Sequence, residues 1–435
     1  MRMGTLLVAG LCACFTGQPL AQQAESTFKL SGYAKLMFVA DDKKGGRVNQ
    51  STPGFGGRLG VETGEFHGFT LLAAAYTTSD LGLRHTDTRR TDAYMFDLDK
   101  KPYSLLGEAQ INYRAGKTTI TAGRQEFFSP IINSYEYRII PNLFEAVTLK
   151  NRDIADTTLT LAYVSKMSGL DGLVSYSEFR SMSQQTYTSL QVAADGTPDA
   201  NNGKTLDPST VVGHHGVWVA GLVHEKDYRL QLWNFHGVDT MNTLYVDGRW
   251  PKVLANEITA TLEGQAYRVT ETGRFKDYLA RQGLNASYGL IGFKGTLAHR
   301  PSGVSVGLAG NKFSGNRSTV TAFGNWGGYP EFVSMPYLYS ENQGISAIAQ
   351  SRLMRMTLLL NLSRFGLTDQ SLLFGHAKIN LDESILANSD IQVDTLLYRA
   401  KLGSKWSLRT ATEWRSSGNS RYDNKFIAVS ARYDF

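Results

Sequence analysis

The sequence predicts an all-β fold, an antiparallel β-barrel that crosses a membrane with its strands. From Thr27 onward, segments of about ten residues alternate between apolar and polar side chains, which is the period of a strand. Short turns and long polar connections alternate between these segments, as they do in barrels whose two ends face different compartments. No stretch of the mature chain offers the ~18 consecutive apolar residues of a membrane-spanning helix. These observations favour a lipid-facing barrel over a helical membrane protein.

A signal peptide is predicted at the start of the chain, over residues 1–21. Arg2 supplies its positive end, a short apolar stretch follows, and Ala21 is a small residue at the cleavage site, which we place to within a few residues. The chain has two cysteines, and both lie inside this leader, at Cys12 and Cys14. The mature part, residues 22–435, is therefore expected to form one barrel domain without disulfides.

Composition excludes several other classes of protein. Only 19% of the 435 residues are charged, against about a quarter in ordinary soluble proteins. Aromatic residues make up 11%, which does not fit a disordered chain. The net charge of +6 is small and dispersed, whereas a nucleic-acid-binding protein concentrates basic residues on one face.

No cofactor, metal ion or catalytic residue is expected. The adjacent His214 and His215 would point to opposite faces of a strand, and no carboxylate or thiol completes a metal site beside them. No nucleophile motif stands out among the serines and histidines.

The two terminal strands show the alternation most clearly. In the first, residues 28–38, apolar or small residues occupy every even position, and the odd positions include Lys29 and Lys35. In the last, residues 424–435, one face is apolar and ends in Tyr433 and Phe435, while the other carries Arg432 and Asp434. An apolar face that ends in aromatic residues is typical of a strand that faces lipid.

Internal segments repeat this pattern, and we assign their polar faces to a water-filled lumen. The polar faces carry Glu108, Gln110 and Asn112 in 105–113, Thr259, Thr261 and Glu263 in 258–266, His376, Lys378 and Asn380 in 373–381, and Arg409, Glu413 and Arg415 in 408–415. The length of the mature chain suits about 16 to 18 such strands, a range that encloses an aqueous channel. Closure of the barrel removes the unpaired edges of an open sheet.

One connection, residues 126–144, is unusually apolar for a loop. Exposed loops are normally polar, so we expect this segment to fold inward, pack on the barrel wall and narrow the lumen. Its candidate constriction residues are Glu126, Pro130, Tyr135, Glu136, Arg138 and Pro141.

The same region resembles a known family. Gly123-Arg124-Gln125 precedes Pro130, Arg138 and Pro141, and a Leu- and Tyr-rich segment at 159–163 is followed by Met167-Ser168-Gly169. This run is similar to the third-loop region of the OprD family of outer-membrane porins.

The resemblance implies a barrel of about 18 strands whose third and seventh loops fold into the channel. It further implies a monomer or loose homotrimer in the outer membrane of a Gram-negative bacterium, in contact with lipid and lipopolysaccharide. Such porins pass small carboxylate-bearing nutrients, amino acids or organic acids, along a ladder of basic side chains.

Alternation places a set of basic residues toward the lumen, and the terminal strands bring six of them together where the barrel closes. This predicted basic row comprises Lys35, Arg58, Arg399, Lys401, Arg409 and Arg432. An opposing acidic wall is expected from Glu108, Glu263, Glu126 and Glu136. The chain departs from the family at Ala411 and Glu413, where further basic residues would be expected.

Three alternative functions stay open at this point. A general diffusion porin with weak ion selectivity would have its basic residues scattered. A barrel enzyme such as a phospholipase would place a serine and a histidine within hydrogen-bond reach on the lipid-facing wall. A fatty-acid transporter would need an amino-terminal plug, for which residues 22–28 are too short.

Overall fold

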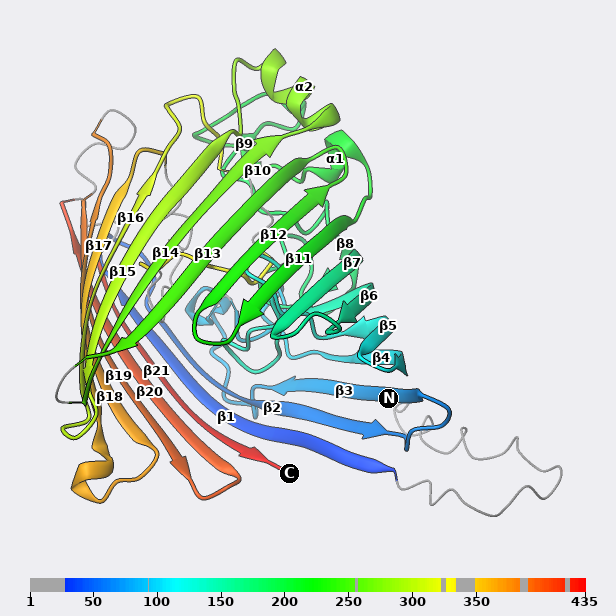
Figure 1. The fold of residues 1–435 in the computed structure, drawn as a ribbon. Coiled ribbons are helices and arrows are strands. Elements are labelled where there is room, and N and C mark those ends of the chain that lie inside the picture. Colours follow the sequence, from blue (N-terminus) through cyan, green and yellow to red (C-terminus); the bar gives the residue numbers. More distant parts are fainter. Residues whose placement is uncertain are drawn as a thin grey trace, which may run out of the picture.

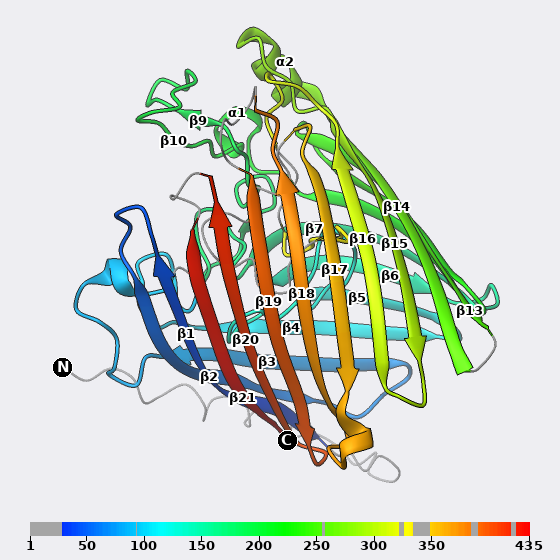
Figure 2. The same ribbon diagram turned by 90° about the vertical axis from the view of Figure 1, so that its left-hand side faces the viewer.

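The computed structural model of the protein describes residues 28–92, 94–254, 257–321, 326–333, 349–383, 390–418 and 423–435. Eighteen antiparallel strands form a closed barrel (Figures 1 and 2), which confirms the predicted fold class. The predicted signal peptide, residues 1–21, lies outside the described residues.

The wall strands follow one another around the barrel in chain order. Their bounds are β1 (Lys29–Lys43), β2 (Gln50–Glu62), β3 (Phe69–Ser79), β4 (Ser104–Ala115), β5 (Thr118–Gln125), β6 (Leu143–Asn151), β7 (Thr157–Ser168), β11 (Val217–Glu225), β12 (Arg229–Gly237), β13 (Met241–Val253), β14 (Ile258–Glu271), β15 (Tyr288–His299), β16 (Val304–Phe313), β17 (Arg352–Asn361), β18 (Gln370–Asn380), β19 (Ile391–Leu402), β20 (Trp406–Ser417) and β21 (Asn424–Asp434). The ring closes where β21 pairs with β1.

Short elements decorate the connections. They are β8 (Arg180–Ser181), which extends the sheet beside β7, the pair β9 (Gln191–Val192) and β10 (Lys204–Thr205), the helices α1 (Ser209–Val212) and α2 (Gly273–Arg281), and the 3₁₀ turns η1 (Thr88–Arg90) and η3 (Leu362–Phe365). The α1, α2 and β9–β10 elements lie together at one end of the barrel, and η3 lies at the other end among the short turns (Figure 1). Within the described part of the chain, no helix has both the length and the apolar character that a membrane span needs.

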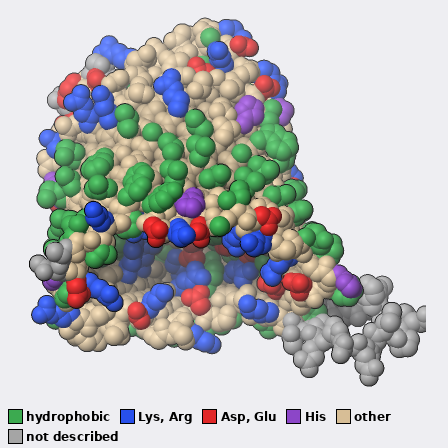
Figure 3. Space-filling view, in the orientation of Figure 1, with side chains coloured by type: hydrophobic (Ala, Val, Ile, Leu, Met, Phe, Trp, Pro, Cys, Tyr) green, Lys and Arg blue, Asp and Glu red, His purple; other side chains and the backbone are tan. Residues whose placement is uncertain are grey.

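The predicted alternation is confirmed on the terminal strands. On β1 the side chains of Leu30, Leu36 and Phe38 are exposed on the outer wall, whereas Lys35 is only 7% exposed and points inward. On β21 Val429 is exposed on the outer wall. Hydrophobic side chains form a band across the outer face of the barrel (Figure 3), as contact with lipid requires.

The interpretation of 373–381 is wrong. β18 turns Leu373, Ala377 and Ile379 toward the interior, and the last two are buried there, while His376 and Lys378 are exposed on the outer wall. This strand is apolar on both faces in its first half, so the alternation of its sequence does not distinguish inside from outside.

A β-bulge changes the faces of β4. The register with β3 shifts between Ala74 and Ala75, so that Gly107 is an extra residue in β4. As a result Leu105 packs against buried residues of the interior, whereas Leu106 is exposed on the outer wall. A bulge inserts one extra residue and so shifts the two-residue alternation of the strand. The strict alternation predicted for 105–113 contained no such shift.

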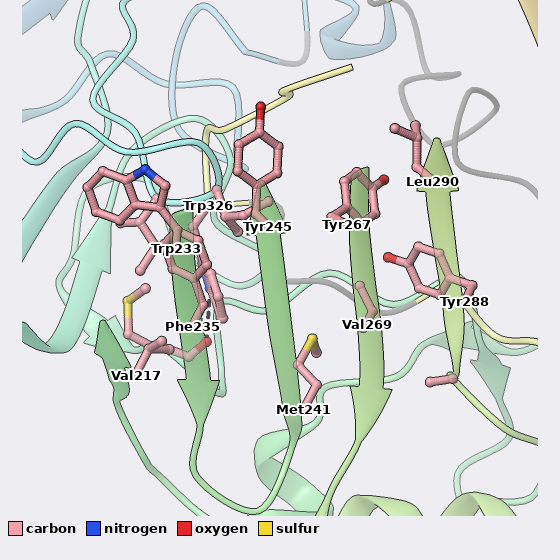
Figure 4. Packing of buried hydrophobic residues seen from close by; sticks show 14 of the residues in the cluster. Val217, Trp233, Phe235, Met241, Tyr245, Tyr267, Val269, Tyr288, Leu290 and Trp326 are labelled. Carbon is pink, nitrogen blue, oxygen red and sulfur yellow. Dashed lines mark hydrogen bonds between the residues drawn. The ribbon is translucent and has the colours of Figure 1, made fainter. Parts of the chain in front are cut away.

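The interior is not polar throughout. Aromatic side chains fill the inner face of neighbouring strands and pack with the loops that enter the barrel (Figure 4). This cluster includes Trp233 and Phe235 of β12, Tyr245 of β13, Tyr267 of β14, Tyr288 of β15, and Trp326 from a late loop. These residues occupy part of the lumen, and open cavities remain beside them, along β4 to β6, and along the wall of β1 and β19 to β21.

Candidate channel constriction

The loop between β5 and β6, residues 126–142, lies inside the barrel, as predicted. It folds back on itself through a bridge between Phe128 and Asn133, and the Ser134 N–H donates to the Phe127 carbonyl over 2.8 Å. Phe127, Ile131 and Ile132 join the aromatic cluster. The apolar residues that marked this loop in the sequence therefore hold it on the inner wall. We call it the constriction loop.

Two anchors fix the second half of the constriction loop. Arg138 is 1% exposed and donates to both carboxylate oxygens of Asp92, over 3.0 and 3.1 Å, in the connection between β3 and β4. The Tyr33 hydroxyl of β1 donates to the Ile139 carbonyl over 2.6 Å. A bidentate, charge-assisted contact of this kind fixes the orientation of both side chains. Arg138 therefore positions the loop, and its buried side chain does not face the channel.

A second loop segment, residues 326–333, closes over the constriction loop. The Asn133 N–H donates to the Trp326 carbonyl over 2.9 Å, and the Gly328 N–H donates to the Ile131 carbonyl over 3.0 Å. Ile132 and Gly327 form a bridge. The inward late loop that the family resemblance implied is thus present in these residues, and it pairs with the constriction loop through backbone hydrogen bonds.

Asp171 links three loops. Its carboxylate accepts hydrogen bonds from Tyr329 Oη (2.6 Å) and Asn142 Nδ2 (2.7 Å), and it lies in the long connection after β7. Burial raises the pKa of Asp171 to about 6, although both hydrogen bonds lower it. The carboxylate is therefore charged above this pH and can hold the loops together there.

Five of the six residues of the predicted basic row surround one cavity of about 590 Å³ beside the constriction loop. These residues are Lys35, Arg399, Lys401, Arg409 and Arg432. Cross-strand register explains the cluster, because Lys35 is paired with Arg432 and Arg399 with Arg409, and these pairs lie on four consecutive strands. Below the outer apolar band, Figure 3 shows the hollow of the barrel with Lys, Arg, Asp and Glu side chains inside it. We call these five residues the basic wall.

The members of the basic wall differ in their partners. Lys35 and Arg432 both form ion pairs with Glu136 of the constriction loop. Arg432 also pairs with Asp434 and lies over the Tyr33 ring. Arg399 and Lys401 are exposed to the cavity, and within the described ranges neither forms an ion pair. These two cations are the most available for a solute.

Arg58, the sixth residue of the predicted basic row, does not line the cavity of the basic wall. Its guanidinium pairs with Glu108 over 2.6 Å and donates to Ser31 Oγ over 3.0 Å. Tyr76 donates to the same carboxylate over 2.7 Å. The alternation of the sequence correctly predicts that Arg58 faces inward. It does not predict the ion pair that Arg58 forms with Glu108, two strands away.

The predicted acidic wall is also revised. Glu136 touches the basic wall directly instead of opposing it, and Glu263 is paired with Lys294 over 2.7 Å. Glu108 and Glu126 do lie together, in a cavity lined by residues of β4 to β6. The enclosure of Glu126 by the barrel, with help from the nearby Glu108, raises its pKa to about 7.

The remaining predicted constriction residues, Tyr135, Pro130 and Pro141, differ in how far they are exposed to the lumen. Tyr135 is 42% exposed toward the basic wall and accepts a long hydrogen bond from Arg409 Nη1, 3.4 Å. Pro130 lines a cavity beside the aromatic cluster, and Pro141 is buried. No sequence pattern indicates Asp92 or Asp171, because their roles depend on loops that meet only in the folded barrel.

Comparisons with known proteins agree with this architecture. A family model described as outer membrane porin, OprD family, matches residues 68–277. The chain is similar to the solved structure of Pseudomonas aeruginosa OccK9 (OpdG), with 13% identity and a TM-score of 0.72 over 94% of this chain and 98% of that chain. None of the curated proteins matches the chain.

Two further solved structures share the fold. Acinetobacter baumannii OccAB1 has 14% identity and a TM-score of 0.71 over 95% of this chain and 99% of that chain. Pseudomonas aeruginosa OccK2 (OpdF), solved in complex with glucuronate, has 15% identity and a TM-score of 0.69 over 94% of this chain and 98% of that chain. At these identities the likeness concerns the fold.

A closed barrel of eighteen strands, narrowed by its own inward loops, defines the class of membrane porins. A model of the OprD family of outer-membrane porins matches residues 68–277, 210 of the 435 residues, and this match confirms the resemblance found in the third-loop region. Proteins of this family are channels that cross the outer membrane many times, not enzymes.

Proposed function

We propose that this porin is substrate-selective and passes small carboxylate-bearing nutrients, amino acids or organic acids, passively across the outer membrane of a Gram-negative bacterium. It would do so as a monomer or a loose homotrimer. The observation that carries the proposal is the basic wall, five cationic side chains around one cavity beside the constriction. OccK2, which shares the fold, was solved with glucuronate, a sugar carboxylate.

The arrangement of the basic wall suits weak and reversible binding of a carboxylate during its passage through the channel. A guanidinium grips a carboxylate through two parallel hydrogen bonds, and Arg399 lies directly across the strand pair from Arg409. Glu136 already neutralises part of the charge of Lys35 and Arg432. Several shallow sites in succession favour both entry and release of a solute. Tyr135 and the constriction loop would limit the size of what passes.

Planar-bilayer recordings with the purified porin test this proposal. Millimolar organic acids are expected to reduce the chloride current of the native channel, because they compete for the basic wall, whereas their neutral amides leave it unchanged. In the double variant Arg399→Gln/Lys401→Gln, the concentration of organic acid that halves the chloride current should rise at least tenfold. A matched control, Lys150→Gln/Arg152→Gln, removes two cations from the cavity at β4 to β6 and should keep it.

Two results would overturn the proposal. A large conductance that organic acids do not affect would identify a general diffusion porin. Equal block in the Arg399→Gln/Lys401→Gln variant and in the control would mean that the selectivity does not reside in the basic wall.

A further inference from the structure

Basic side chains also gather on the outside of the barrel, where lipid is expected. Lys312 of β16 is paired across the sheet with Arg352 of β17, and Lys378 of β18 lies diagonally beside Arg352. All three side chains are exposed. Arg268 of β14, also exposed, flanks them two strands away. We call Lys312, Arg352 and Lys378 the outer basic patch.

The outer basic patch lies at the end of the barrel that carries the long loops. Lys312 is one residue from the end of β16, Arg352 begins β17, and Lys378 is two residues from the end of β18. In Figure 3, Lys and Arg side chains gather at the upper left, over the upper ends of β16 and β17. The longer connections of outer-membrane barrels face the cell exterior, so the patch belongs to the outer leaflet.

Strand length sets the depth of the patch. β16 and β17 have 10 residues each and β18 has 11, which is what a tilted strand needs to cross the hydrocarbon core. Their terminal residues therefore lie at the level of the lipid headgroups. Exposed apolar side chains adjoin the patch, since Ile291 lies directly opposite Lys312 and Met354 directly opposite Lys378, and Met356 follows further along β17.

The outer basic patch brings like charges together on neighbouring strands. Like charges on neighbouring strands destabilise a sheet, and within the described ranges no ion pair joins Arg268, Lys312, Arg352 or Lys378 to a carboxylate. The outer-wall carboxylate of Asp394 is occupied by His376, 2.8 Å away. A cluster of this kind is stabilised by an anion supplied from outside the protein.

We infer that the outer basic patch binds the phosphate groups of lipopolysaccharide in the outer leaflet. Phosphate is the anionic group of that lipid at headgroup level, and adjacent Arg and Lys side chains recognise it through charge-assisted hydrogen bonds. The acyl chains would then lie along Ile291, Met354 and Met356. The inference requires the outer-membrane location of the barrel but not the selectivity of its channel.

Native mass spectrometry of the purified barrel with lipid A tests the inference. The native protein is expected to retain bisphosphorylated lipid A and to bind its dephosphorylated form at least tenfold more weakly. Lys312→Gln/Arg352→Gln/Lys378→Gln should bind the bisphosphorylated form at least tenfold more weakly than the native protein. Lys252→Gln/Arg300→Gln/Lys405→Gln removes three exposed cations at the short-turn end and should bind normally.

Folding is checked independently. The variant Lys312→Arg/Lys378→Arg keeps the charge and should keep lipid A bound, and bilayer conductance should be the same in all variants because the patch faces away from the lumen. Undiminished binding of lipid A by the Gln triple variant would overturn the inference. Equal retention of the phosphorylated and dephosphorylated lipids by the native barrel would overturn it as well.

Discussion

At the scale of single residues, the buried pair of Arg138 and Asp92 decides where the constriction loop lies. Removing one partner of a buried ion pair leaves an uncompensated charge, which destabilises by about 3–5 kcal/mol. Asp92→Leu is therefore expected to release the second half of the loop and to raise single-channel conductance in planar bilayers, while the barrel stays folded. The double variant Asp92→Leu/Arg138→Met removes both charges and should return part of the way to the native conductance. Unchanged conductance in the single variant would exclude this role.

A second residue-scale prediction concerns Glu126. Because its pKa is raised to about 7, the side chain carries a negative charge at pH 8 and is mostly neutral at pH 6. Protonation removes a charge that repels anions from the lumen, so the anion-to-cation permeability ratio should rise as the pH falls from 8 to 6. Reversal potentials in a salt gradient measure this ratio. In Glu126→Gln the rise should be largely absent, and a full pH response in that variant would assign the titration to another group.

At the scale of elements, the two inward loops depend on a close backbone contact at Gly327. Its φ is +86°, and a Cβ there would lie 2.2 Å from the Asn133 carbonyl oxygen. Gly327→Ala should therefore separate residues 326–333 from the constriction loop at a cost of about 1–3 kcal/mol, seen as larger and noisier single-channel currents. Gly366→Ala is the matched control, with a φ of +80° and open space around the Cβ, at the short-turn end. Equal currents in both variants would refute the contact.

The strands show how much the sequence could predict. On β1, β14 and β20 the prediction assigns the two faces correctly, because charged residues such as Lys35, Glu263 and Arg409 mark the inner face and alternate with apolar or small residues that face lipid. For β18 the prediction reverses the two faces, since the inner face packs on protein and the outer face carries His376, Lys378 and Asn380.

The loop contacts were less predictable than the strands. The apolar character of residues 126–144 predicted an inward loop, but the partners Asp92, Asp171 and Gly327 come from three other connections. Sequence periodicity carries no information on which loops meet. For the same reason the prediction placed Arg58 in the basic row, although Glu108 binds it.

At the scale of the whole molecule, closure of the barrel and formation of the channel share the same residues. The seam between β1 and β21 brings Lys35 next to Arg432, two cations on neighbouring strands. Like charges in this position destabilise a sheet pair, and Glu136 of the constriction loop binds both. The loop that narrows the channel thus also neutralises the seam that closes the barrel.

Glu136→Gln separates these two effects. Loss of the carboxylate leaves two neighbouring cations uncompensated, so the free energy of unfolding should fall by up to about 3 kcal/mol, and the midpoint of thermal unfolding should fall with it. This is the lower end of the range for a buried ion pair, because the Glu136 side chain is 16% exposed. The same change adds positive charge to the basic wall and should raise the anion-to-cation permeability ratio. Adding Arg432→Gln to this variant should restore thermal stability, because it removes the repulsion, and should lower the permeability ratio again. If Glu136→Gln left both the unfolding midpoint and the permeability ratio unchanged, the seam would be held by its backbone pairing alone.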